Sequence, residues 1–166
     1  MTDMDGVLGA TRGAVATLVL AAEARADVWT VPRAPGKWSP SQLAEHVARS
    51  LEESANEVAG VPSKFPNLPF FLKPVARAFL FNRVLKNGTF PRARTSRPFD
   101  PATGPTTPAE ARQRLEVAAR RFDAACRARA AKDDEIASTV FGVVKISDYV
   151  RFQEIHTRHH TKQMQA

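Results

Sequence analysis

The chain has 166 residues, of which 43% are hydrophobic and 25% are charged, a composition typical of one soluble domain spanning residues 1–166. Its net charge of +7 raises the question of nucleic acid, but the basic residues form no single tract and no nucleic-acid-binding motif is present. We therefore expect no nucleic-acid partner; the charge serves equally well to attract a small anionic substrate. The single cysteine, Cys126, cannot form an internal disulfide, which fits a reducing cytoplasm.

Apolar residues recur at helical spacing from Val7 onward, which predicts a first helix over residues 3–26. Residues 14–22 also resemble the core of a short signal peptide, but Asp3 and Asp5 remove the positive bias that normally precedes one. We therefore expect a bundle helix in a cytoplasmic protein. No run of residues approaches the length that spans a bilayer, so we expect no membrane partner.

The second helix carries a complete set of start signals. Ser39 is a natural N-cap, Pro40 suits the first helical position, and Gln42 completes a capping box. The predicted helix ends at Gly60, and its phase turns His46 toward the core.

A third helix, rich in phenylalanine, is predicted over residues 70–87 after three prolines. Its apolar residues cover more than one stripe, so part of its surface should contact something beyond its own bundle. The alternatives are a homodimer contact and a hydrophobic wall beside a substrate. The connection that follows, residues 89–106, is long enough to suggest a function. Arg94 and the other arginines of residues 92–97 are candidates for receiving an anionic substrate.

A second capping box, from Thr107 to Glu110, starts the fourth helix, in which Cys126 falls in phase with core residues. Residues 140–144 favour a briefly extended backbone, and we expect no strand partner for them. Ser147 is the predicted cap of the final helix. These segments predict an all-α fold: a four-helix bundle with an additional helix in a long crossover connection.

Three of the four histidines are expected to converge in this bundle. His156 and His160, four residues apart, project from one face of the final helix, a spacing that suits two imidazoles on one metal ion. His46, from a facing helix, would complete a three-nitrogen site with a position free for water or substrate. His159 is rotated by about 100° from His160 and should be a neighbour rather than a ligand. From the spacing alone, ordinary core histidines remain the alternative.

The final helix does not carry the H-E-x-x-H motif of zinc peptidases. Thr157 occupies the position of its general base, so peptide hydrolysis by that mechanism is disfavoured. No Ser-His-Asp elbow, phosphate-binding glycine loop or dinucleotide fingerprint is present either. In a catalytic protein the metal would therefore carry the chemistry.

Three motifs follow one another along nearly the whole chain: WSPSQLAEH at residues 38–46, Phe141-Gly142, and His156-x-x-x-His160-x-x-Gln163. Together they resemble the DinB-like, damage-inducible superfamily of bacterial metal-binding four-helix bundles. The resemblance implies that the metal ligands are His46, His156 and His160. It implies a divalent ion, zinc or nickel first, with iron or manganese as alternatives.

Members of that superfamily include thiol S-transferases that use bacillithiol or mycothiol, and a maleylpyruvate isomerase. The resemblance therefore implies a metal-dependent thiol S-transferase or hydrolase with a small-molecule substrate, such as a low-molecular-weight thiol. Gln163, one turn beyond His160, would orient a ligand or substrate. The chain departs from relatives that have Glu where it has Thr157, and no thiol-binding residue can be matched. The alternative is a non-catalytic metal-binding stress-response module, either monomeric or a homodimer.

Overall fold

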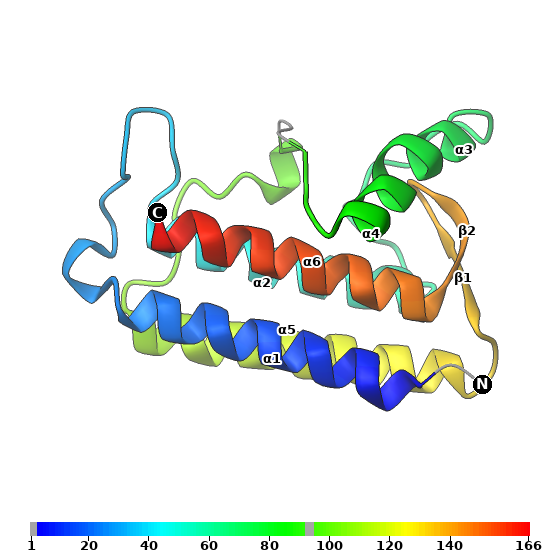
Figure 1. Cartoon of the computed structure of the whole chain (residues 1–166), viewed down its shortest axis with the longest axis horizontal. Coiled ribbons are helices and arrows are strands. Elements are labelled where there is room, and N and C mark those ends of the chain that lie inside the picture. The colour runs from blue at the N-terminus through cyan, green and yellow to red at the C-terminus, as the bar shows by residue number, and fades with distance from the viewer. Residues whose placement is uncertain (1–2, 92–94) are drawn as a thin grey trace.

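The computed structural model describes residues 3–91 and 95–166, and its frame is a bundle of four long helices (Figure 1). Helices α1 and α6 run in one direction, and α2 and α5 run in the other (Figure 1). The expected all-α four-helix bundle with a helical crossover is confirmed. The four helices are α1 (Met4–Glu23), α2 (Pro40–Ala59), α5 (Pro108–Ala130) and α6 (Ile146–Gln165).

The expectation that no run of residues is long enough to span a bilayer is wrong for helix α1, which is long and apolar enough by length and composition alone. In this fold the apolar face of α1 packs against the other helices, and Leu8, Val15 and Leu18 are buried in the bundle core. The helical spacing predicted for this segment is therefore confirmed, whereas the cytoplasmic location stays a prediction.

Helix α2 begins as its sequence predicts. The Ser39 hydroxyl accepts a hydrogen bond from the backbone N–H of Gln42 at 3.3 Å, and the Gln42 side chain accepts one from the Ser39 N–H at 3.0 Å. Gly60 ends the helix in the left-handed conformation with φ of 73°, which costs a residue without Cβ little. These two ends set the phase that turns His46 inward, where it is 4% exposed.

The chain needs a long crossover because α2 and α5 are parallel neighbours in the bundle (Figure 1). A 20-residue helix is about 30 Å long, so the chain must travel that distance back before α5 can start. The expected helix over 70–87 is present in shorter form and ends at Gly88 in the left-handed conformation. Its parts are α3 (Lys73–Ala76), a π-helical turn (Arg77–Phe81) and α4 (Asn82–Asn87).

Helix α5 begins with Thr107 as its N-cap, as predicted, and its hydroxyl accepts from the Glu110 N–H at 3.1 Å. The predicted capping box is only half formed, because the Glu110 carboxylate accepts hydrogen bonds from the N–H and hydroxyl of Thr106 in place of the Thr107 N–H. Cys126 is fully buried in the core, and burial raises the pKa of its thiol to about 12. Its assignment as a small core residue therefore holds.

The expectation of an unpaired extended segment near residue 140 is wrong. Strands β1 (Glu135–Ser138) and β2 (Gly142–Lys145) form an antiparallel hairpin with Ile136 opposite Val144. The buried side chains of the two strands are Ile136, Ser138 and Val144, and one or two inward side chains per strand give too short an alternation to recognise in sequence.

The prediction that Ser147 caps the last helix is also wrong. Helix α6 starts two residues earlier than predicted, at Ile146, with Lys145 at the N-cap and no side-chain cap. The Ile146 N–H is satisfied instead by the carbonyl of Asp134 at 2.8 Å. The helix continues directly from β2, so the chain at the start of the hairpin provides the hydrogen-bond acceptor that a capping side chain would otherwise provide.

A buried carboxylate joins α2 to this hairpin and to α6. Glu57 is 6% exposed and accepts hydrogen bonds from the N–H and hydroxyl of Thr139, each at 2.7 Å. It also accepts from the Tyr149 hydroxyl at 2.6 Å. Burial, and then the Glu57 charge, raise the pKa of Tyr149 well above its usual value. The tyrosine is therefore a neutral donor at neutral pH.

The end of the crossover is held against the start of α2. The Pro105 carbonyl accepts from the Ser41 hydroxyl at 2.7 Å and from the Trp29 indole N–H at 2.8 Å. Gly104 lies so close that a Cβ on it would be 2.3 Å from the Ser41 carbonyl oxygen. Only glycine fits this approach.

We expect Gly104→Ala to destabilise the protein by about 1–3 kcal/mol, because the crossover backbone must move away from Ser41. Gly13→Ala is the matched control, since a Cβ at Gly13 in α1 meets nothing within 4 Å. Alanine should stabilise that helix position by about 0.5–1 kcal/mol. Denaturant unfolding measures both changes, and equal stability of the two variants would contradict the close approach described.

Candidate metal centre

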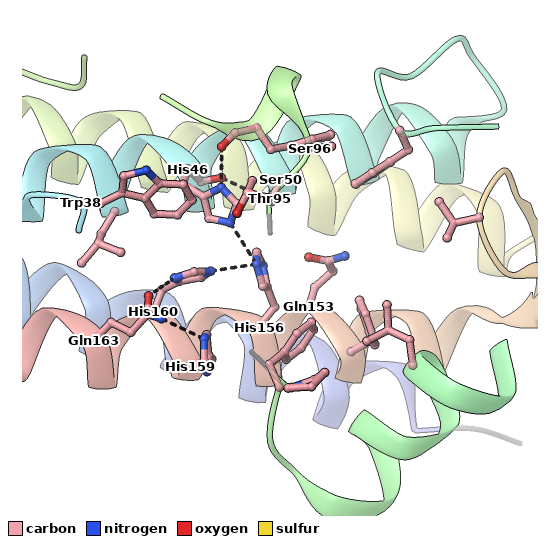
Figure 2. Close-up of a pocket in the computed structure, with 18 of the residues that line it drawn as sticks. Trp38, His46, Ser50, Thr95, Ser96, Gln153, His156, His159, His160 and Gln163 are labelled. Carbon is pink, nitrogen blue, oxygen red and sulfur yellow. Dashed lines mark hydrogen bonds between the residues drawn. The ribbon is translucent and has the colours of Figure 1, made fainter. Parts of the chain in front are cut away.

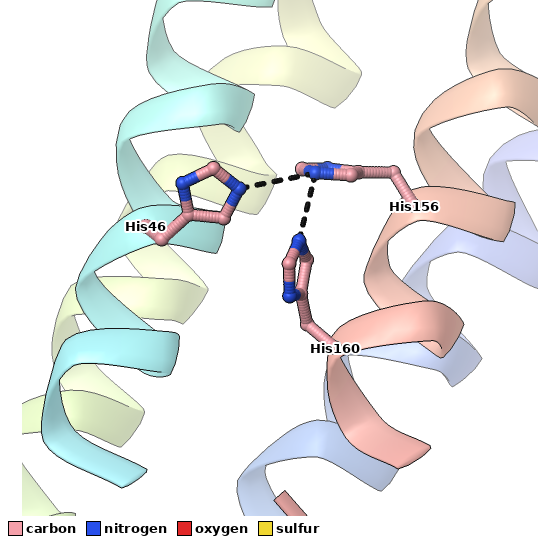
Figure 3. Close-up of side chains that lie close together, drawn as sticks. All are labelled: His46, His156 and His160. Carbon is pink, nitrogen blue, oxygen red and sulfur yellow. Dashed lines mark hydrogen bonds between the residues drawn. The ribbon is translucent and has the colours of Figure 1, made fainter. Parts of the chain in front are cut away.

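Three histidine side chains meet between α2 and α6 (Figure 3). The Nε2 atom of His156 lies 3.1 Å from Nε2 of His46 and 3.0 Å from Nε2 of His160. One ring nitrogen from each residue falls within 4.8 Å of the others. The structure thus brings together the three histidines selected from helix phase, and their binding of a metal stays a prediction.

Hydrogen bonds on the far side of two rings determine which nitrogen faces the centre. Nδ1 of His46 lies 2.7 Å from the carbonyl oxygen of Phe99, which can only accept, so this nitrogen carries the proton. Nδ1 of His160 donates to Oε1 of Gln163 at 2.8 Å. Both rings therefore present an unprotonated Nε2 to the centre, as metal-bound imidazoles do.

The spacing of the nitrogens fits a small divalent ion. Ligand nitrogens at about 2.0–2.1 Å from a tetrahedral ion lie roughly 3.3 Å apart, close to the 3.0 and 3.1 Å found here. Imidazole ligands suit zinc, nickel, copper and iron better than magnesium or calcium. Three protein ligands also leave a tetrahedral ion one position for water or substrate.

The surroundings keep the imidazoles neutral. Burial lowers the pKa of His46, and it lowers the pKa values of His156 and His160 well below the ordinary value. The neighbouring rings add to this effect, because a positive charge on one imidazole disfavours charge on the next. Since only neutral imidazole can bind a metal, the site is prepared for one at neutral pH.

The Gln163 side chain links the centre to the fourth histidine. While its Oε1 accepts from His160, its Nε2 lies 3.0 Å from Nε2 of His159 (Figure 2). His159 stands beside the triad and outside it, as its rotation on the helix predicts. Gln163 therefore contacts a candidate ligand directly, and its expected orienting role applies to the His160 ring.

We expect Gln163→Leu to weaken metal binding about 10- to 100-fold, because the His160 ring loses the partner that fixes its tautomer. Gln165→Leu is the control, because Gln165 lies on the same helix turn, is exposed, and is not among the hydrogen-bond partners of the described histidines. Competition with a coloured chelator measures both affinities. Equal affinities of the two variants would show that Gln163 has no part in the site.

Aromatic rings enclose the triad on two sides. The Trp38 ring centroid is 4.7 Å from that of His46, and the Phe90 centroid is 5.1 Å from that of His156. Trp38 is held in place because its indole N–H donates to Asp100 at 3.0 Å. Such walls restrict water around the histidines and strengthen electrostatic interactions inside the site.

The triad opens on a pocket of about 670 Å³ (Figure 2). His46 and His160 are buried, whereas His156 keeps part of its surface accessible. The wall is mostly apolar, and Arg33 and Lys37 add positive charge. The apolar side chains of the wall include Phe65, Leu80, Phe90, Val140, Phe141 and Phe152.

Gln153 lines this pocket one turn before His156 and is 4% exposed (Figure 2). Its Oε1 atom is buried and has no hydrogen-bond partner among the described residues. A buried acceptor without a partner costs about 1–3 kcal/mol, so such groups are uncommon unless they have a role. A ligand that carries a hydrogen-bond donor would satisfy it.

Part of this site was not predicted from the sequence. Arg94, the arginine selected for an anionic substrate, lies outside the described residues. Arg33 and Lys37 line the pocket instead, and the only signal for them was their position in a Pro- and Gly-containing loop before α2. The carbonyl of Phe99 left no signal at all, since any residue type carries one.

One family model, described as the DinB superfamily, matches residues 10–164. The matched segment contains all four histidines and the four long helices almost entirely. The resemblance drawn from the three motifs is confirmed. No curated protein and no solved structure matches this chain significantly.

Proposed function

Because the chain belongs to the DinB superfamily, we propose that it binds one divalent ion through His46, His156 and His160 and acts on a small molecule. The observation that carries this proposal is the convergence of three Nε2 atoms at 3.0 and 3.1 Å on the wall of a pocket. Zinc or nickel fits the all-imidazole donor set best, and iron or manganese is the alternative.

A divalent ion with an open coordination position would supply Lewis acidity, which lowers the pKa of bound water to about 7 and deprotonates a bound thiol. The protein's own groups do the rest. Phe99 and Gln163 hold the rings of His46 and His160, so the geometry exists before a substrate arrives. Trp38 and Phe90 exclude water from the flanks of the triad.

Thiol S-transfer is the reaction that this pocket supports best. The aromatic wall suits the apolar body of an electrophile, and Arg33 and Lys37 suit the carboxylates of a small anionic thiol. Gln153 would accept a hydrogen bond from an amide or hydroxyl of the substrate. In the reaction, the thiol sulfur bonds to the electrophilic carbon, the leaving group departs with its bonding pair, and the thiol proton passes to solvent. In the hydrolytic alternative, water takes the place of the thiol.

Elemental analysis of the purified protein, followed by a conjugation assay, tests this proposal. Zinc- or nickel-loaded protein should conjugate a low-molecular-weight thiol to chlorodinitrobenzene, and chelator-treated protein and His156→Ala should not. Stoichiometric metal without conjugation or ester hydrolysis would overturn the enzymatic part and favour a non-catalytic metal-binding module. Protein that takes up no metal would overturn both.

A further inference from the structure

The turn before α3 and the helix that follows it expose large apolar side chains. Phe70 is 84% exposed, Phe71 62% and Phe79 74%, and Leu72 and Val75 are also exposed. Most soluble proteins expose such residues singly, so several on one short segment indicate a contact surface. We call these five residues the phenylalanine edge.

The fold does not account for the phenylalanine edge. The inner side of the same helix already packs on the bundle through Phe81 and Val84, which are almost completely buried. Elsewhere on this helix Arg77 donates to the Val143 carbonyl of the hairpin at 2.9 Å, and Val143 is itself exposed. In Figure 1 this part of the crossover projects from one end of the bundle beside β2.

The charged residues of the crossover segment all have one sign. Between Glu57 and Asp100 the sequence contains eight lysines and arginines and neither aspartate nor glutamate. In the bundle helices several arginines form ion pairs with carboxylates, as Arg112 does with Glu23 and Arg127 does with Asp123. Among the described residues, none of the cations in the crossover helix has a carboxylate within 4.0 Å. These cations are Lys73, Arg77, Arg83 and Lys86.

We propose that the phenylalanine edge binds peripherally to an anionic lipid bilayer. The aromatic side chains enter the boundary between headgroups and acyl chains, and the lysines and arginines face lipid phosphates. Exposed aromatic and aliphatic side chains with cations beside them are also typical of segments that bind at a membrane interface. Each cation near an anionic surface adds about 1 kcal/mol.

The charge argues against a second copy of this chain as the occupant. A twofold dimer places the same surface on both sides of its interface, so the cations of one edge would face those of the other without a carboxylate to pair with. The expectation of no membrane partner rested on the lack of a spanning segment. Peripheral binding needs none, and the exposure of Phe70 and Phe79 became apparent only in the fold.

Vesicle co-sedimentation of the full chain tests this proposal. The protein should sediment with vesicles of mixed phosphatidylcholine and phosphatidylglycerol, less so at high salt, and little with phosphatidylcholine alone. Phe70→Ser with Phe79→Ser should lower the partition coefficient about tenfold or more. Arg83→Gln should lower it about fivefold. Both phenylalanines are exposed, so the melting temperature should change little.

Leu20→Ser is the matched control, because Leu20 on α1 is 64% exposed and lies outside the edge. This variant should bind anionic vesicles as the unchanged protein does. Failure of the unchanged protein to bind anionic vesicles would overturn the proposal, as would equal binding by the Phe70→Ser, Phe79→Ser variant. A dimer that this double substitution dissociates, without vesicle binding, would show that a second copy covers the edge.

Discussion

Replacing His156 by alanine is expected to abolish stoichiometric metal binding. His156 is the central member of the triad, with its Nε2 about equally close to those of His46 and His160. Two imidazoles on separate helices hold a divalent ion much less well than three. We therefore expect metal affinity to fall by more than about a hundredfold, which is more than the loss expected from removing a group that only contacts a ligand. Elemental analysis of the purified variant measures the result.

His159→Ala is the control for this substitution, because it removes an imidazole of the same helix that is not one of the three converging residues. His159 contacts Gln163 and not the triad nitrogens, so this variant should retain most of its metal. His46→Ala and His160→Ala should behave as His156→Ala does. Full metal content in His160→Ala together with loss in His159→Ala would show that a different pair of α6 histidines binds the ion.

Stabilisation by metal is expected to disappear at acid pH. The folded state lowers the pKa values of His46, His156 and His160 below the unfolded value of about 6.5. Folding therefore favours their neutral forms; this contribution to stability is complete above the unfolded pKa and is lost as pH falls through the folded values. A bound metal adds to the effect in the same direction, because protons compete with it for the same nitrogens.

The measurement is the difference in melting temperature between metal-loaded and chelator-treated protein. It should be large near pH ~7.5 and shrink toward pH ~5. His156→Ala should show almost no difference at any pH. A difference that stays constant over this range would mean that the ion, if bound, is held by groups other than imidazoles.

The parts of this site that sequence predicts are those set by local helix geometry. His156 and His160 share a face because four residues make about one turn, and Ser39 and Gln42 fix the start and hence the phase of α2. Two such local rules place three imidazoles between facing helices before any tertiary contact is known. The motifs that carry the family resemblance are built on the same residues.

The parts that sequence does not predict are contacts between distant segments. The Phe99 carbonyl that orients His46 comes from a residue 53 positions away and carries no residue-specific signal. Glu57 resembles any surface glutamate until Thr139 and Tyr149 are brought to it. The hairpin was missed for a similar reason, because its first strand follows a charged stretch and buries only Ile136 and Ser138.

The central claim is that three imidazoles hold a divalent ion and leave a position open on the pocket. X-ray absorption spectroscopy of zinc-loaded protein tests it most directly. We predict imidazole scattering from three nitrogen ligands at about 2.0–2.1 Å and one further light atom, which a small thiol replaces with sulfur at about 2.3 Å. A spectrum without imidazole scattering, or one with a closed four-ligand shell that added thiol leaves unchanged, would contradict the account.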